Sequence, residues 1–392
     1  MPNSASSERG FFGSRETRKY DPDAIGICVS GGGYRATLFH AGSFLRMNEL
    51  GYLGRARRIA SVSGGSITTG ILAMNWDKID WGADGIASHE AMTEHLIRPV
   101  LAAVSRTIDV GVGLRRLVPG LSAGNALANS YDRNIFDGLK LGEITDKVHF
   151  CFCATNLQTG GLVRFTRTYA ADWQALMSTV RTIRLADAVA ASSAFPPVLS
   201  PVRLSLGDED VTVPDGARVD DPAYRRELVL VDGGVYDNLG LETIWRRCGV
   251  ILCANAGGNL APDPGSFRFS HMTRVVYAML EVTVNWRERM LVHLLQNRLS
   301  DERTERVGAL WTNGTAPSAY RGTADGFPDS WTGAKPSDAE IEVARTLPTR
   351  LKSFSRAEER AAILAGYAHA DAAIRRYFDT DAAPPAAPPV LP

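Results

Sequence analysis

Apolar runs and helical patterns alternate along the first two thirds of the chain. Short apolar runs, typical of buried strands, stand at 25–29, 59–62, 148–154, 228–231 and 250–254, and residues 162–168 are a further candidate strand. Helical spacing of apolar residues appears between them at 37–50, 67–76 and 185–193. Strands that alternate with helices predict an α/β fold, in which a mostly parallel central sheet lies between two helical layers in an α/β/α sandwich. We expect the run at 250–254 to be the last strand of this sheet.

The same pattern divides the chain into regions. Residues 1–23 predict a flexible N-terminal arm, and residues 24–258 hold the α/β domain. Within that domain the pattern weakens over 77–147, which we interpret as an insertion that covers it. The apolar residues of this insertion fit an acyl channel as well as a packed core. The Ala- and Pro-rich residues 382–392 predict a disordered tail.

The region 259–381 is helical in character. Apolar and charged residues alternate at helical spacing over 273–299. Further on, Ser355 and Glu358 form the pattern of a capping box, which predicts a helix that reaches about Tyr377. We expect this helical part to pack on the same domain.

The charge balance excludes some classes of function. Lys plus Arg and Asp plus Glu number 43 each, so no global field attracts the chain to a nucleic acid polymer or an anionic membrane. No apolar stretch approaches the roughly 18 residues of a membrane span, and the N-terminal segment lacks the apolar core of a secretory signal. The five cysteines are odd in number and mostly stand in strand-like runs, which predicts buried thiols in a reducing compartment. We therefore expect a cytoplasmic protein.

Ser63 stands where a strand turns sharply into a helix. The apolar run before it ends at Val62, and Gly64 and Gly65 follow before the helical pattern begins. Such a turn lifts a serine hydroxyl onto an exposed, strained corner, as at a nucleophile elbow. It needs small neighbours, here Ser61 and Gly65, because the strand and the helix come close together. Glycine-rich turns of this kind also bind phosphates or merely turn the chain.

A second glycine cluster, Gly31-Gly32-Gly33-Tyr34-Arg35, follows the first strand and precedes a helix. Its backbone N–H groups predict an anion cradle, which suits a diphosphate or the oxyanion of a tetrahedral intermediate. The spacing from Gly31 to Ala36 also fits a relaxed dinucleotide fingerprint, but that interpretation needs an acidic residue at the end of the next strand. Ser63 stands there instead, so the pattern disfavours dinucleotide binding.

A nucleophilic serine needs a base. Asp232 follows an apolar strand and precedes Gly233 and Gly234, so we expect it at a strand end that faces the same edge of the sheet as Ser63. A plain Asp-Gly turn is the alternative interpretation. A Ser-His-Asp triad stays open, although none of the later histidines adjoins a glycine turn at a strand end: His89, His95, His149, His271, His293 and His369.

In this order, the Gly31–Arg35 cluster, the Ser63 elbow and Asp232-Gly233-Gly234 resemble the motifs of the patatin-like phospholipases. These are serine lipid acyl hydrolases with a Ser-Asp dyad, related to the catalytic domain of cytosolic phospholipase A2. The resemblance spans about residues 24–258. Ser61 departs from the Gly-x-Ser-x-Gly pattern that is usual at the elbow, and it adds a Cβ at a crowded point.

The resemblance implies a role for each motif. Ser63 is the nucleophile and Asp232 is the base, with Ser61, Gly65, Gly233 and Gly234 as supporting residues. The N–H groups of Gly31, Gly32 and Gly33 form the oxyanion hole. Arg35 matches the basic residue after the family's glycine run and is a candidate contact for the substrate or its phosphate.

The resemblance also implies the activity, which is hydrolysis of carboxylic ester bonds of lipids or phospholipids through an acyl-enzyme. The partners are then a lipid substrate and, transiently and locally, a membrane surface. No group of His, Asp and Glu has the spacing of metal ligands, and a Ser-Asp dyad needs no metal or cofactor. Two alternatives remain: a soluble short-chain esterase with the same dyad, and a regulatory protein that binds a nucleotide or phosphate without catalysis.

Overall fold

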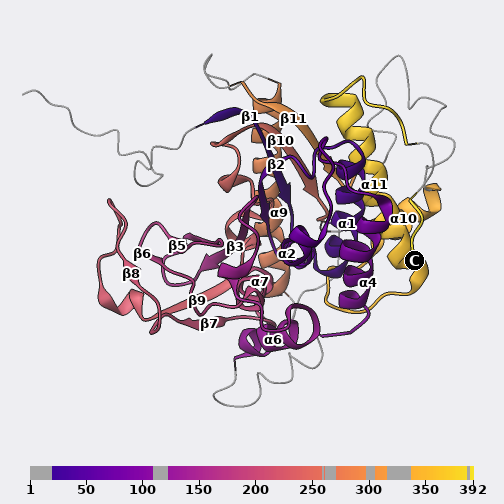
Figure 1. Ribbon diagram of the computed structural model, residues 1–392. Helices are drawn as coiled ribbons and strands as arrows, with labels where there is room; N and C mark the ends of the chain where they lie inside the picture. The colour runs from indigo at the N-terminus through magenta and orange to yellow at the C-terminus, as the bar shows by residue number, and fades with distance from the viewer. Residues whose placement is uncertain are drawn as a thin grey trace, which may run out of the picture.

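The computed structural model describes residues 20–108, 122–257, 260, 271–296, 305–315, 337–385 and 389–392. Over these residues the chain forms an eleven-stranded sheet with helices on both faces (Figure 1). Neighbouring strands in the centre run parallel, in the order β11-β10-β1-β2-β3. Their bounds are β1 Asp21–Val29, β2 Ala56–Ser61, β3 His149–Asn156, β10 Cys248–Asn255 and β11 Val307–Thr312.

The sheet continues beyond β3 with antiparallel strands. One path runs from β4 to β8, and β9 pairs with both β3 and β7. The bounds are β4 Leu162–Phe165, β5 Ala170–Asp172, β6 Leu176–Ser178, β7 Val202–Ser205, β8 Val211–Thr212 and β9 Glu227–Asp232. The prediction that the strand near 250–254 ends the sheet is wrong. β11 adds a parallel edge strand next to β10, brought there from a part of the sequence that follows a long helix.

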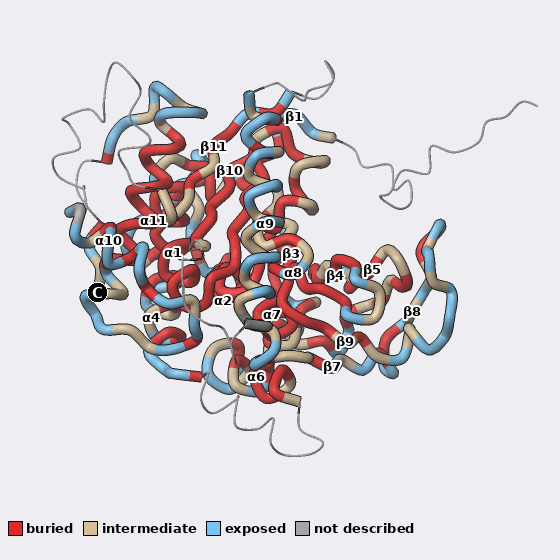
Figure 2. Tube along the Cα trace, turned by 180° about the vertical axis from the view of Figure 1, so that it is seen from behind, coloured by how far each residue is buried: buried red, intermediate tan, exposed pale blue. Residues whose placement is uncertain are grey.

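Helices cover both faces of the sheet. Alternate residues of β1 point to opposite sides, since side chains along a strand have a period of two. Ile25, Ile27 and Val29 join the larger core cluster, whereas Cys28 joins a smaller cluster that includes Leu291 of helix α9. α9 accordingly lies on the face of the sheet opposite α1 and α11 (Figures 1 and 2). The predicted three-layer α/β/α fold is confirmed.

Most predicted helices are present, with shifted ends. The helix expected from residue 37 begins four residues earlier, at Gly33, and the helix over 185–193 is confirmed. Ser355 and Glu358 form the predicted capping box. The bounds are α1 Gly33–Glu49, α2 Gly64–Asn75, α3 His89–Met92, α4 Arg98–Val104, α6 Ala123–Tyr131, α7 Leu185–Ser193, α8 Gly234–Asp237, α9 His271–Leu295, α10 Asp338–Thr346 and α11 Arg356–Tyr377.

Helix α11 packs tightly on α1 and belongs to the same core. A Cβ on Gly42 of α1 would lie 1.8 Å from a backbone oxygen of α11, and a Cβ on Gly366 of α11 would lie 1.8 Å from one of α1. Beside this crossing, the buried guanidinium of Arg46 pairs with the buried carboxylate of Asp371 at 2.8 Å. A buried cation and anion need each other, so this pair fixes how the two helices meet.

Three further predictions concern the insertion, the arm and the tail. Ile97, Val100 and Val104 of the insertion are wholly buried in the main core, so for them packing prevails over an acyl channel.

Strand β1 begins at Asp21, inside the range assigned to the arm, and residues 1–19 lie outside the described residues. The sequence predicts a disordered tail, but the described part of the tail packs on the protein, because Pro385 and Pro389 are buried. All five cysteines are buried free thiols.

Candidate active site

Ser63 occupies a strained turn between β2 and α2. Its φ of 52° and ψ of −122° lie in a region that residues other than glycine rarely adopt. Two hydrogen bonds hold it there, because its N–H donates to Ser192 both at the carbonyl oxygen (3.1 Å) and at Oγ (3.0 Å). The geometry is that of a nucleophile elbow, as the sequence predicts.

The glycines around the elbow are required by close backbone contacts. A Cβ on Gly65 would lie 2.6 Å from the carbonyl oxygen of Ser30 and 2.8 Å from that of Val29, at the end of β1. A Cβ on Gly64 would lie 2.0 Å from the carbonyl oxygen of Gly33. The elbow therefore rests directly on the glycine loop that follows β1, which is why both segments need residues without side chains.

Ser61, the departure from the usual elbow pattern, is accommodated by a chain of buried hydroxyls. Its Oγ accepts a hydrogen bond from Ser66 Oγ at 2.9 Å, and Ser66 Oγ lies 2.8 Å from Ser192 Oγ. Ser192 Oγ donates in turn to the carbonyl oxygen of Cys153 at 2.7 Å. Because the hydroxyl of Ser61 has a partner, it is not left as an unsatisfied polar group in the core.

The strand register explains why Asp232 lies beside Ser63. Ser61 on β2 is level with Phe152 on β3, and two residues further along, Ala154 is level with Asp232 on β9. Ser63 is also two residues beyond Ser61, so the two side chains reach the same height. Asp232 ends a strand and lies beside Ser63, as the sequence predicts, but β9 is antiparallel to β3 and arrives from the far side.

Burial sets the ionisation of Asp232. The side chain lies in the protein interior, and this desolvation raises its pKa to about 6; hydrogen bonds from the N–H of Gly234 and from the Ser63 side chain act in the opposite direction. Oδ1 accepts the Gly234 N–H at 2.7 Å. Oδ2 is buried and has no well-aligned hydrogen-bond partner among the described residues, although the Ser63 hydroxyl is close enough to lower the pKa. One carboxylate oxygen is thus available as a proton acceptor.

The glycines after Asp232 close the loop against β3. A Cβ on Gly233 would lie 2.1 Å from the carbonyl oxygen of Cys153, and a Cβ on Gly234 would lie 3.0 Å from Oδ1 of Asp232 itself. The N–H of Gly233 donates to the carbonyl oxygen of Ser192 at 3.1 Å. These contacts hold the carboxylate at the elbow.

The glycine loop between β1 and α1 faces the elbow. A Cβ on Gly31 would lie 3.0 Å from Cβ of Ser63, so the loop and the serine are in contact. Gly32 and Gly33 both have positive φ, 143° and 61°, and their N–H groups have no acceptor within the described part of the chain. Gly31 differs from the prediction, because its N–H already donates to the carbonyl oxygen of Asn238 at 3.1 Å. Of the three glycines predicted to form an oxyanion hole, Gly32 and Gly33 thus keep an N–H group without an acceptor among the described residues.

Arg35 is buried and bonded inside the protein. Its guanidinium donates to the carbonyl oxygens of Ala256 (3.1 Å) and Leu347 (2.6 Å) and to Oγ1 of Thr349 (2.9 Å), and burial lowers its pKa to about 10. These contacts join the start of α1 to the end of α10. They do not support the prediction that Arg35 contacts the substrate.

Two contributors to the site carry no signal in the sequence. Ser192, at the end of α7, bonds the backbone on both sides of the dyad, and Asn238 holds the glycine loop. Both act through contacts between residues far apart in the chain. Three of the histidines have contacts other than Ser63 and Asp232. His40 bonds the carbonyl oxygen of Ser30 at 2.9 Å, His149 lies in a separate pocket, and His369 packs on Phe39.

The fold and the site are those of an α/β protein with a nucleophile elbow of the type found in hydrolases. Comparison of the chain with known protein families and structures identifies its family. A sequence model described as "Patatin-like phospholipase" matches residues 27–245, more than half of the chain. The chain belongs to the patatin-like phospholipase family, whose members are lipid acyl hydrolases. No curated protein sequence matches the chain.

One solved structure has a similar fold, and a second is a weaker match. Human GIVD cytosolic phospholipase A2 in complex with methyl gamma-linolenyl fluorophosphonate has a TM-score of 0.50 at 15% identity, over 89% of this chain and 57% of that chain. VipD from Legionella pneumophila has a TM-score of 0.36 at 14% identity, over 89% of this chain and 66% of that one. The chain spans less than two thirds of the length of the human protein. At such identities the human structure supports the fold alone.

A search of the described helices finds none long and apolar enough to cross a membrane. The same part of the chain contains no group of three or more His, Cys, Asp or Glu side chains arranged to hold a metal ion.

Proposed function

We propose that the protein hydrolyses carboxylic ester bonds of lipids or phospholipids, with Ser63 as the nucleophile and Asp232 as the base. One observation carries the assignment: a serine in a strained elbow lies beside a buried carboxylate that has a free oxygen. Family membership supports lipid esters as the substrate class.

The reaction follows from these positions. Oδ2 of Asp232 takes the proton of Ser63 Oγ as that oxygen attacks the ester carbonyl carbon. The N–H groups of Gly32 and Gly33 donate to the oxyanion, an interaction whose loss typically lowers the rate by about 10²–10³. Asp232 then protonates the departing alcohol, and a water molecule, deprotonated by the same carboxylate, releases the acid from Ser63. A base with a pKa of about 6 is ionised at neutral pH and still basic enough to take the proton.

Helix α9 offers a surface for the lipid. Its outward face is apolar, although the helix lies at the surface: Trp286 is 66% exposed and Met279 is 65% exposed. Its acidic residues turn inward instead, since Glu288 bonds Asn255 and Glu281 bonds the backbone N–H of Leu260. This is the reverse of an ordinary surface helix. The exposed apolar residues follow helical spacing and form what we call the α9 face: Val275, Met279, Val282 and Trp286.

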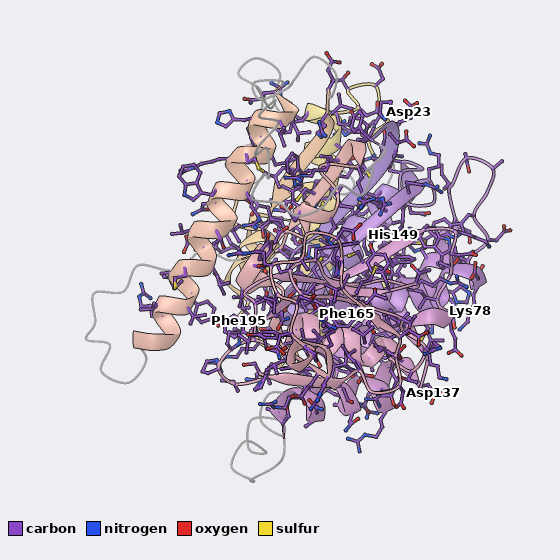
Figure 3. The ribbon with its side chains drawn as sticks, turned by 90° about the vertical axis from the view of Figure 1, so that its left-hand side faces the viewer. Asp23, Lys78, Asp137, His149, Phe165 and Phe195 are labelled. Atoms are coloured by element: carbon purple, nitrogen blue, oxygen red, sulfur yellow. The ribbon has the colours of Figure 1, made fainter. Side chains whose placement is uncertain are left out.

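The chemistry of the α9 face fits the surface of a lipid bilayer. Arg289 is exposed beside it and lies 5.8 Å from the ring of Trp286, and an aromatic ring next to a cation suits the headgroup level of a membrane. The face is also close to the site. Phe195 lies beside α9 (Figure 3), where the ring of Tyr277 packs on it at a centroid distance of 5.1 Å. The carbonyl oxygen of the residue before Phe195 accepts the N–H of Asp232. A bilayer bound there would present its ester bonds near the dyad.

The function is tested on a mixed lipid extract. Wild type and Ser63→Ala are incubated with it, and mass spectrometry compares the products. We expect free fatty acids and lysolipids with the wild type and neither with the variant. Fatty acid release only from short-chain soluble esters would contradict the lipid substrate and favour the short-chain esterase. Equal release by both proteins would contradict the role of Ser63.

A further inference from the structure

A second cluster of chemistry lies at the opposite end of the strands from the dyad. It is a pocket lined by four arginines, and by other polar side chains from β2, β3, β4 and the turn before β10. Arg58 and His149 form the first register pair between β2 and β3. Ser63 is five residues further along the chain, roughly 15 Å at the rise of a strand. The pocket is therefore separate from the active site. Its lining residues are Arg58, His149, Cys151, Arg164, Tyr169, Glu242, Thr243, Arg246 and Arg247.

The lining of this pocket is rich in positively charged side chains. Its lining holds four guanidinium groups and one carboxylate, that of Glu242. The cations disturb one another: burial and then the charge of Arg247 lower the pKa of Arg58. Burial, followed by the charges of Arg58 and Arg247, lowers the pKa of His149 to about 3, so its ring stays neutral and does not add to the positive charge. Like charges held together out of water cost free energy unless an anion joins them.

Arg164 shows most directly that the pocket lacks a partner. Its Nε is buried and has no hydrogen-bond partner among the described residues. Neither Arg164 nor Arg58 forms a salt bridge with an acidic side chain in the described part of the chain, whereas Arg184 bonds both Asp132 and Asp187. Buried donors in folded proteins nearly always have acceptors. A donor without one, inside a cluster of cations, indicates a bound anion.

We infer that this pocket binds a phosphate group. Guanidinium donors form paired hydrogen bonds with the oxygens of phosphate, and they come here from several strands, as a tetrahedral anion requires. The pocket measures about 10 Å³, the room of one water-sized sphere, so it admits an oxygen of a compact anion and not a base or an acyl chain. A free phosphate and the phosphate of a lipid headgroup share this chemistry.

The test measures phosphate binding in the full chain. Isothermal titration with inorganic phosphate is run at constant ionic strength on Ser63→Ala and on the same protein with Arg58→Gln or Arg164→Gln. Arg203→Gln is the matched control, because Arg203 is an exposed arginine paired with Glu227 on the surface. We expect saturable binding that either pocket variant weakens by tenfold or more and that the control leaves unchanged. Arg58→Lys, which keeps the charge without the paired donors, should weaken binding less than Arg58→Gln.

A second arm distinguishes the source of the phosphate. Binding to phosphatidylcholine vesicles is compared with binding to vesicles that also contain phosphatidic acid. If only the acidic vesicles bind, and Arg164→Gln abolishes this, the ligand is a lipid headgroup; if only inorganic phosphate binds, it is a free anion. The inference is overturned if neither inorganic phosphate at millimolar concentration nor the acidic vesicles bind, or if Arg58→Gln and Arg164→Gln bind as tightly as Arg203→Gln. Neither arm depends on hydrolysis, so the result is independent of the proposed function.

Discussion

The backbone N–H of Ser63 donates to Ser192 twice, to its carbonyl oxygen at 3.1 Å and to its Oγ at 3.0 Å. The same carbonyl oxygen accepts the N–H of Gly233 at 3.1 Å. Ser192 therefore joins the elbow to the loop that follows Asp232. The spacing of the Ser63 and Asp232 side chains therefore depends on a residue of α7 that belongs to neither motif.

Ser192→Ala should lower kcat while leaving KM nearly unchanged. The variant loses the Oγ that holds the Ser63 N–H and the buried hydroxyl chain, and a small misplacement of reacting groups costs up to about 10²-fold. Ser193→Ala is the matched control, because its Oγ bonds Val189 and Tyr131 and not the elbow. We expect both variants to lose similar stability and only Ser192→Ala to lose kcat. Equal kcat values would assign Ser192 a structural role only.

Activity should fall on the acid side of about pH 6. The raised pKa of Asp232 means that the carboxylate is protonated below that value and cannot take the proton of Ser63. The logarithm of kcat/KM for a soluble ester should therefore rise with unit slope up to about pH 6 and then level. If the acid limb of this pH profile instead levels near pH 4, the range of an ordinary aspartate, Asp232 is not buried during the reaction.

Asp232→Asn should stabilise the fold at high pH. A folded-state pKa near 6, against 3.8 for an ordinary aspartate, means that the folded state keeps a proton that the unfolded state releases. The free energy of unfolding therefore has its full value with respect to this group below about pH 4. It falls by on the order of 3 kcal/mol as the pH rises towards 6. Asn carries no charge and avoids that loss. Denaturant unfolding should find the variant equal to wild type at pH 4 and more stable at pH 8. A difference that does not change with pH would contradict the burial of the charge.

Met279→Glu and Trp286→Glu should reduce hydrolysis of vesicles, by tenfold or more, without affecting a soluble monomeric ester. Each places a charge on the α9 face, which opposes entry into the lipid interface. Val343→Glu is the control, since Val343 is an exposed apolar residue of α10 away from that face. Equal loss with all three variants, or no loss with any, would show that the α9 face does not meet the lipid.

The glycine runs beside Ser63 and Asp232 made these two residues candidates from the sequence, whereas the residues that support them through long-range contacts have no such motif. The glycines at 31–33, 64–65 and 233–234 stand in short runs that the sequence shows directly, although the backbone contacts that leave no room for a Cβ come from distant segments, such as Gly33 against Gly64 and Cys153 against Gly233. Ser192 and Asn238 work through contacts with residues far away in the chain, so no spacing announces them.

The direction of β9 and the internal contacts of Arg35 could not be predicted for the same reason. An apolar run such as that of β9 looks alike in either direction, and only its register with β3 shows it to be antiparallel. The partners of Arg35 at Leu347 and Thr349 lie more than 300 positions along the chain. Strand β11 likewise finds its place only by pairing with β10.

Covalent labelling with a fluorophosphonate tests the central claim most directly. The probe reacts with an activated serine, and mass spectrometry of the digested protein locates it. The account predicts one labelled peptide, with the probe on Ser63, no labelling of Ser63→Ala, and labelling of Asp232→Asn slowed by at least about tenfold. A label on another serine, or labelling of Ser63→Ala at the wild-type rate, would contradict it.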